Sequence, residues 1–310
     1  MNEVTTAPKS KSNSKFQGHL AVIVANTIFG LSVPVTNDLV VNHLTPMGYM
    51  FFRCAGAALL FWLIALFLPR ERVARKDLWV MIGGGLLGFA VSQTLAAWSL
   101  HYTTPVYFSI LAALTPIAVM ILAWFFLRER ITGWRLVGVL LGIGGVVLMT
   151  LMGAEMGTGS NDLLGILLGL GSLLTWAVYL IITSKVSEKY SSVTQMKWMF
   201  LASTVAVLPL AWNELPAQAL WSEPDMARGI VEMVFIIVIV TVLAFFLIPF
   251  AMKRIEATMV SVYTNLQPIV ASAVSIIIGV DLLTWDKVAA AVLVLLSAYI
   301  VSRPAPTAAD

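Results

Sequence analysis

Residues 109–117 read SILAALTPI, and residues 261–269, which lie 152 positions later, read SVYTNLQPI. Serine, leucine, proline and isoleucine coincide when the two stretches are aligned. The same register continues without a gap and pairs Glu129 with Asp281, Thr132 with Thr284, Arg135 with Lys287 and Leu141 with Leu293. The chain therefore contains an internal repeat, and this repeat decides which fold we expect.

The composition of the chain excludes a water-soluble fold. Of the 310 residues, 59% are hydrophobic and 11% are charged, whereas soluble domains have about 45–50% apolar and about 25% charged residues. One cysteine, Cys54, rules out an internal disulfide framework and a four-cysteine zinc site. A net charge of +3 without a long basic face argues against nucleic-acid binding. We therefore expect lipid to surround most of the protein.

Ten apolar stretches are long enough to cross a bilayer as helices, which takes about 20 residues each. They lie at residues 17–37, 45–68, 78–100, 104–127, 133–152, 163–184, 194–213, 229–251, 257–279 and 284–302. The runs are too long and continuous for lipid-facing strands, which alternate over segments of about ten residues. The sequence predicts an all-α integral membrane protein with ten transmembrane helices.

The lysines and arginines predict an orientation. With the N-terminus in the cytoplasm, sixteen of them fall in cytoplasmic segments, two (Arg228 and Lys287) fall outside, and Arg53 lies within a span. Because cytoplasmic loops carry the excess of positive charge, we expect both termini in the cytoplasm. The expected location is a bacterial-type inner membrane, with the first apolar segment kept as a helix rather than cleaved as a signal peptide.

A glycine-rich polar loop at 153–162 separates two halves. We expect a disordered tail at 1–16, a five-helix repeat at 17–153, a second at 162–303, and a tail at 304–310. Since five is odd, equivalent helices cross the membrane in opposite directions, and such inverted repeats are typical of secondary transporters. The alternative is a duplication that only built a stable bundle.

Sequence motifs in both halves resemble those of a known family. The run Leu114-Thr-Pro116, followed by Leu127-Arg-Glu129-Arg-Ile-Thr132-Gly-Trp-Arg-Leu-Val-Gly138 and Gly145, is similar to the signature of the EamA family of the drug/metabolite transporter superfamily. The second half is a weaker copy and departs at Asp281, Ala290 and Ser297. The resemblance covers about residues 17–303. It implies a ten-helix permease that moves amino acids and other small metabolites, often outward, through a central cavity.

Pro116 and Pro268 are predicted near the middle of the fourth and ninth helices. Each proline removes a backbone donor and disturbs the carbonyl four residues earlier. One interpretation is a hinge, in which a kink opens a binding site and lets half of a helix swing. The other is a static kink that aids packing.

Polar and aromatic residues at similar depth are the candidate substrate-binding residues. An amide without a partner in hydrocarbon costs several kcal/mol, so these amides should face protein or water, and hydrogen bonding between helices explains them as well as substrate contact does. Tyr263 and Gln267 share one helix face, unlike Asn265. The predicted set is Asn26, Trp98, Tyr107, Ser109, Thr115, Trp176, Tyr263, Asn265 and Gln267.

Arg53 is the charged residue predicted inside the bilayer. It could pair with a substrate carboxylate or control a gate. Alternatively it is structural, either snorkelling toward the outer surface or forming a salt bridge with Asp38 or Glu232. Glu129 and Thr132, like Asp281 and Thr284, are expected at helix ends, the threonines as N-caps.

These features predict a secondary transporter of small metabolites, such as amino acids or related zwitterions, that works by alternating access. No enzyme activity, cofactor or metal site is expected, because the sequence has no nucleotide-binding run and no histidine cluster with metal-ligand spacing. The expected partners are the substrate and the bilayer, with the chain a monomer or homodimer. Small-multidrug efflux is the main alternative, followed by a channel, a membrane-embedded enzyme or a scaffold.

Overall fold

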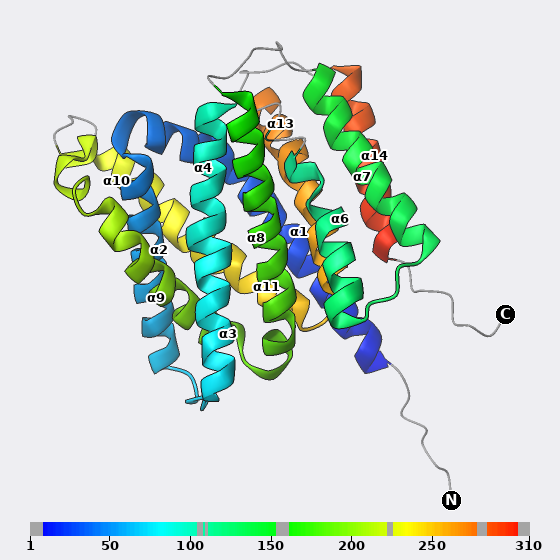
Figure 1. Ribbon diagram of the computed structural model, residues 1–310, viewed down its shortest axis with the longest axis horizontal. Helices are drawn as coiled ribbons and strands as arrows, with labels where there is room; N and C mark the ends of the chain where they lie inside the picture. The colour runs from blue at the N-terminus through cyan, green and yellow to red at the C-terminus, as the bar shows by residue number, and fades with distance from the viewer. Residues whose placement is uncertain are drawn as a thin grey trace, which may run out of the picture.

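The computed structural model describes residues 9–103, 108, 111–152, 161–221, 226–277 and 284–302. These residues are mainly helical, and no strand occurs among them. The helices lie side by side and run between two ends of the molecule (Figure 1). The predicted all-α class is therefore confirmed for this part of the chain.

The helices of each half follow one another through short connections. The first half contains α1 (Lys9–Asp38), η1 (Leu39–His43), α2 (Pro46–Leu66), α3 (Arg75–Gly85), η2 (Leu86–Val91), α4 (Ser92–Tyr102), α6 (Thr115–Leu122), η3 (Ala123–Leu127) and α7 (Gly133–Met152). The second contains α8 (Asp162–Lys189), α9 (Ser192–Ala211), η4 (Leu215–Ala217), η5 (Ala219–Trp221), α10 (Met226–Phe235), η6 (Ile236–Leu243), α11 (Ala244–Met252), α12 (Ala257–Val262), η7 (Tyr263–Asn265), α13 (Leu266–Ile277) and α14 (Trp285–Ser302). Of the η elements, η4, η5 and η7 are 3₁₀ turns and the others are π-helical.

Six helical stretches among the described residues are long and apolar enough to cross a membrane. They are Ser14–Thr36, Pro46–Leu66, Arg75–Ser99, Leu163–Lys189, Ser192–Ala211 and Met226–Met252. Leu111–Leu127, Gly133–Leu148 and Lys287–Val301 are shorter apolar helices, and η7 interrupts the helix at 257–277. Where the ten predicted segments are described, they are mainly helical, and six helical stretches of the described chain are clear candidate spans.

Helix starts are set by local side-chain caps. Thr45 accepts a hydrogen bond from the Gly48 N–H at 3.1 Å, and proline occupies the first position of α2. Asn161 and Ser191 cap α8 and α9 in the same way. A side-chain acceptor satisfies one of the free N–H groups of a first turn, and proline has no N–H to satisfy there.

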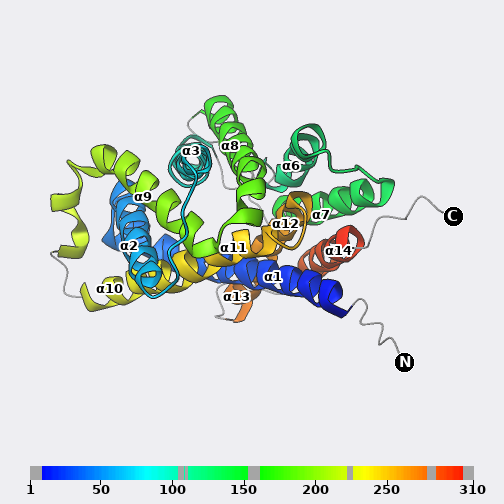
Figure 2. The same ribbon diagram turned by 90° about the horizontal axis from the view of Figure 1, so that it is seen from below.

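The packing of the helices follows a pattern that recurs in both halves. Helix α2 packs against α9, and α7 packs against α14. Helix α1 packs against α11 and α13, while α8 packs against α3, α4 and α6. Figure 2 shows α7 and α14 together at one side of the molecule and α2 and α9 at the other, with α1 and α11 between them.

The close approach of α7 to α14 depends on glycine. A Cβ atom added at Gly145 would lie 2.9 Å from the Ala290 carbonyl oxygen, and one at Gly138 would lie 2.6 Å from a Val301 methyl group. The two helices are therefore antiparallel and nearly in backbone contact, as expected where small residues line an interface between membrane helices.

Polar contacts join the connections at each end of the bundle. At the lower end in Figure 1, Glu71 accepts hydrogen bonds from Ser191, and Asp77 accepts one from Tyr190 at 3.0 Å. At the upper end, Arg228 pairs with Asp38 at 2.9 Å. Polar side-chain contacts therefore join described connections at each end, and the apolar core lies between them.

Candidate functional site

Two of the predicted amides meet between α1 and α13. The Gln267 Nε2 donates to Asn26 Oδ1 at 2.7 Å, and the Asn26 Nδ2 donates to the Val22 carbonyl at 2.8 Å. Asn26 is fully buried. A hydrogen bond between helices therefore satisfies both amides in this conformation, and each amide keeps further polar capacity that a substrate could use.

Tyr263 also contacts α1. Its hydroxyl lies 3.0 Å from His19 Nδ1, and the two rings are 5.8 Å apart between centroids. Tyr263 and Gln267, which are four residues apart, thus both contact α1. The interrupted helix α12–η7–α13 is attached to α1 through Tyr263, the first residue of its 3₁₀ turn, and through Gln267, which follows the turn.

Asn265 points elsewhere. It is 3% exposed, and its Nδ2 has no hydrogen-bond partner among the described residues. A Cβ at Gly142 would lie 2.8 Å from this nitrogen and 2.6 Å from the Ser297 Oγ, which also has no partner in the described chain. Asn265 therefore faces α7 and α14, away from the Asn26–Gln267 pair.

The two prolines lie within helical stretches, and each follows a local turn that the sequence did not predict. Pro116 lies in the first turn of α6 after a turn at Leu114, and Pro268 lies in the first turn of α13 after η7. Each proline thus lies inside a helical stretch, at 111–127 or 257–277, directly after a local turn in it. Proline is well suited to a first turn, where no backbone donor is required. Their role as hinges stays a prediction.

The expected salt-bridge partners of Arg53 are wrong. Asp38 and Glu232 both bind Arg228, at 2.9 and 3.0 Å. The Arg53 Nε donates instead to the Thr241 hydroxyl at 3.0 Å, and its guanidinium carbon lies 5.2 Å from the centre of the Phe245 ring. Arg53 is half-buried, and among the described residues no carboxylate lies within ion-pair distance of it.

A small cavity adjoins Arg53 in the middle of the bundle. Its free space is about 10 Å³ in this conformation, close to what one water molecule occupies. Three phenylalanines form an aromatic cluster there, with Phe89 and Phe200 stacked at 4.6 Å. The lining residues are Met50, Arg53, Cys54, Phe89, Gln93, Phe200 and Phe245. None of them except Arg53 is charged.

Trp176 joins this cluster from α8. Its ring lies 4.9 Å from that of Tyr179 and 6.4 Å from that of Phe245. Phe29, one turn after Asn26 on α1, also contacts Phe245, at 4.9 Å. Helix α1 therefore links the amide pair to the cavity beside Arg53.

The remaining predicted residues lie apart or outside the described chain. Trp98 is 46% exposed and stacks on Tyr102, and Thr115 is buried at the start of α6. Tyr107, Ser109, Asp281, residues 1–8 and the tail at 304–310 lie outside the described residues. A substrate-binding role for these positions stays a prediction. Residues 9–16, which were expected in a disordered tail, form the start of α1 instead.

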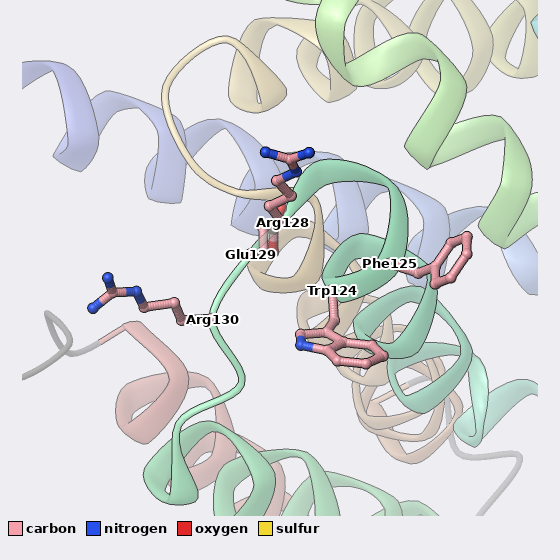
Figure 3. A pocket seen from close by; sticks show the side chains of 5 residues that line it. All are labelled: Trp124, Phe125, Arg128, Glu129 and Arg130. Atoms are coloured by element: carbon pink, nitrogen blue, oxygen red, sulfur yellow. The ribbon is translucent and has the colours of Figure 1, made fainter.

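A second cavity, of about 290 Å³, lies at the lower end of η3. Figure 3 shows the five side chains that line it, with Arg130 directed away from the rings of Trp124 and Phe125. It opens at the surface beside these exposed rings, where lipid and headgroups are expected. We therefore take the smaller central cavity as the candidate substrate site.

Glu129 beside this surface cavity connects the two halves. Its carboxylate accepts hydrogen bonds from the Thr258 hydroxyl at 2.8 Å and from the Ala257 N–H at 3.3 Å, and so caps α12. Burial, together with the charge of Glu256, raises the pKa of Glu129 against the opposing effect of these hydrogen bonds. Thr132 accepts a long hydrogen bond, 3.4 Å, from the Arg135 N–H at the start of α7.

Sequence reasoning missed the aromatic lining and Thr241, because phenylalanine and threonine are common in membrane helices. The repeat register carried a usable signal. A shift of 152 residues places Phe89 on Thr241 and Gln93 on Phe245, and all four surround Arg53. Equivalent positions of the two halves therefore meet at this cavity.

Comparison with known proteins identifies the class of the chain. The model of the EamA-like transporter family matches residues 16–151 and again 163–303. Relatives include the uncharacterized transporter YetK of Bacillus subtilis, 25% identical over 83% of this chain and 78% of its own length. Another is the uncharacterized inner membrane transporter YhbE of Escherichia coli, 24% identical over 66% of each chain.

A solved structure described only as the crystal structure of a protein shares the fold. Its TM-score is 0.76 at 17% identity, over 91% of this chain and 95% of its own. The uncharacterized transporter YvbV of Bacillus subtilis is 25% identical over 77% of each chain. Since the family model covers most of the sequence in two consecutive matches, this chain belongs to the EamA-like transporter family.

Proposed function

We propose that the protein is a secondary transporter that moves a small zwitterionic metabolite, such as an amino acid, by alternating access. The observation that carries the proposal is the meeting of both halves at one central cavity, lined by residues of α2, η2 and α4 from the first half and of α9 and α11 from the second. In secondary transporters, substrates bind near the midplane where discontinuous helices of two repeats meet. The family membership supports the transport class.

The proposed architecture is ten transmembrane helices in two inverted five-helix repeats, at 17–153 and 162–303. The packing supports it, because exchanging the halves converts the contacts of α1 with α11 and α13 into those of α8 with α4 and α6. The pairs α2–α9 and α7–α14 convert into themselves. Such exchange is expected when a two-fold axis relates two equivalent units.

We further propose that both termini are cytoplasmic, in a membrane of the bacterial inner type. The loops at 67–74, 128–132, 189–191 and 253–256 all lie on the expected cytoplasmic side and carry Arg70, Arg72, Arg128, Arg130, Lys189, Lys253 and Arg254. Contacts of Glu71 with Ser191 and of Glu129 with Thr258 join these loops in pairs. Reporter fusions test the orientation: alkaline phosphatase activity from a fusion within 70–76 would contradict it.

The chemistry of the site supports a neutral or zwitterionic substrate. The amide pair offers donors and acceptors, the aromatic cluster offers apolar walls, and no described lining residue is acidic. A bulky hydrophobic cation would lack a counter-charge there. We propose transport without a covalent step, cofactor or metal, by a monomer or homodimer.

A metabolite-export screen in cells that overexpress the chain tests this function. The expected result is faster export of one or a few amino acids or related compounds, reproduced as saturable counterflow in proteoliposomes. Resistance to hydrophobic cations alone would favour the multidrug alternative. Flux that does not saturate would indicate a channel, and absence of flux would indicate a scaffold or an enzyme.

A further inference from the structure

Arg53 is a charged group in the bundle for which the described residues supply no counter-ion. Its two Nη nitrogens make no hydrogen bond to any described residue, and the only polar contact is from Nε to Thr241. An unpaired guanidinium inside a membrane protein is costly, and such residues usually mark a substrate path. The charge is therefore available to a ligand.

The surroundings fix the direction of the guanidinium. The Thr241 hydroxyl donates to the Ile236 carbonyl at 2.8 Å, so its oxygen is held in place to accept from Arg53 Nε. Phe245 lies against the guanidinium carbon at 5.2 Å, within the range of a cation–π contact. These two contacts occupy one edge and one face and leave the end with both Nη atoms unused.

The unused end of a guanidinium matches one ligand group especially well. Two parallel N–H groups bind the two oxygens of a carboxylate at once, which a lysine cannot do. The other lining residues near Arg53 are apolar or neutral, including Phe89, Phe200 and Gln93. A group with two or more negative charges would keep uncompensated charge beside Arg53, whereas the charge of a monocarboxylate would be neutralised by it.

We propose that the Arg53 cavity is a carboxylate-binding subsite for a small monocarboxylate whose apolar or aromatic body rests on Phe89, Phe200 and Phe245. This inference rests on the proposed transport function and names the group that the transporter recognises. The cavity has to widen to accept a ligand. Because Thr241 and Phe245 belong to η6 and α11 while Arg53 belongs to α2, separation of these helices enlarges it.

The binding test uses the purified full-length protein in detergent and pairs of compounds that differ only in the carboxylate. The probes are leucine and leucinamide, phenylalanine and phenylalaninamide, and the remaining apolar and aromatic amino acids with their amides. We expect the acid of at least one pair to raise the melting temperature in a saturable way, at a concentration about tenfold or more below its amide.

Variants locate the effect. For Arg53→Gln, about tenfold more of the acid should be needed to raise the melting temperature, while the response to the amide should change little. Arg53→Lys keeps the positive charge but cannot bind both carboxylate oxygens at once. The acid concentration that it requires should lie between those of the parent and of Arg53→Gln. Arg228→Gln, which removes an arginine from the ion pairs at the upper end, is the matched control and should bind like the parent.

The parent protein alone can overturn the inference, so the test holds even if an Arg53 variant does not fold. Equal responses to acid and amide, or no response to any acid, contradict the subsite. An unchanged acid response in Arg53→Gln contradicts it as well. If cells then export a metabolite without a carboxylate, the transport function stands and only the subsite is wrong; if nothing is exported, the transport function fails separately.

Discussion

The helix interruptions before Pro116 and before Pro268 occupy equivalent positions but differ in chemistry. The first passes through Leu114 and Thr115, and no side-chain hydrogen bond from it is seen in the described chain. The second contains Tyr263, Asn265 and Gln267, two of which bind α1. The duplicated backbone has been kept in both halves, whereas the polar groups are concentrated in one.

The repeat register and the side chains therefore carry different information about the two interruptions. The register locates where a helix can break in both halves. The side chains decide which break is attached to its neighbours and which leaves polar atoms without partners. A cavity lined by equivalent positions of both halves can therefore be asymmetric, with Arg53 on α2 and Val205 at the equivalent position on α9.

The largest expected effect comes from Gln267→Leu. The substitution removes the donor to Asn26 Oδ1 and leaves a fully buried acceptor unpaired, which costs about 1–3 kcal/mol. We expect transport per inserted molecule to fall about tenfold or more and the melting temperature to decrease. The matched variant in the first interruption, Thr115→Val, should lose less than about twofold. Equal losses would show that the two interruptions do not differ in function.

A glycine pair on α7 tests the surroundings of Asn265. Alanine at Gly142 would place its Cβ 2.8 Å from Asn265 Nδ2 and 2.6 Å from Ser297 Oγ, whereas nothing lies within 4 Å of a Cβ at Gly144. Overpacking costs about 1–3 kcal/mol. Gly142→Ala should therefore lower the melting temperature, and Gly144→Ala should not. An unchanged melting temperature for Gly142→Ala would mean that the side chains of Asn265 and Ser297 can move aside without loss of stability.

The prolines test whether the interruptions move. Alanine in place of Pro116 or Pro268 supplies a backbone N–H and is the best helix former, so the helix can run on through the break. Each single variant should transport about threefold less at matched membrane expression, an effect of about 0.7 kcal/mol, and the double variant should be worse. If both single variants transport at the rate of the parent, the interruptions serve only the packing of the helices and do not move.

The smallest effect on transport is expected at the cap that holds α12 before the second interruption, where the change is one of stability. Because the pKa of Glu129 is raised in the folded protein, its contribution to stability is present at low pH and is lost as the pH rises through that pKa. Glu129→Gln should therefore lose less stability than the parent between about pH 4 and pH 8. Thr132→Ala should instead cost about 1 kcal/mol at every pH, and melting curves across pH separate the two.

Much of the fold could be predicted from the sequence, because apolar length and the repeat register are local properties. The described parts of the expected segments are mainly helical, six helical stretches are candidate spans, and the interruptions occur next to both prolines. The partner of Arg53 could not be predicted, since Asp38 and Glu232 are also within reach of Arg228, and sequence spacing does not tell which arginine is closer. The stacking of Phe89 on Phe200 depends on how distant helices pack, which no single-helix pattern contains.

Cys54, the single cysteine of the chain, forms part of the wall beside Arg53 and is 1% exposed. A thiol reagent therefore has one place to react in the natural sequence. It can do so only while the wall of the cavity is parted, because a buried thiol is shielded from reagents in solution. The rate of modification thus measures how often the cavity opens, without any engineered label.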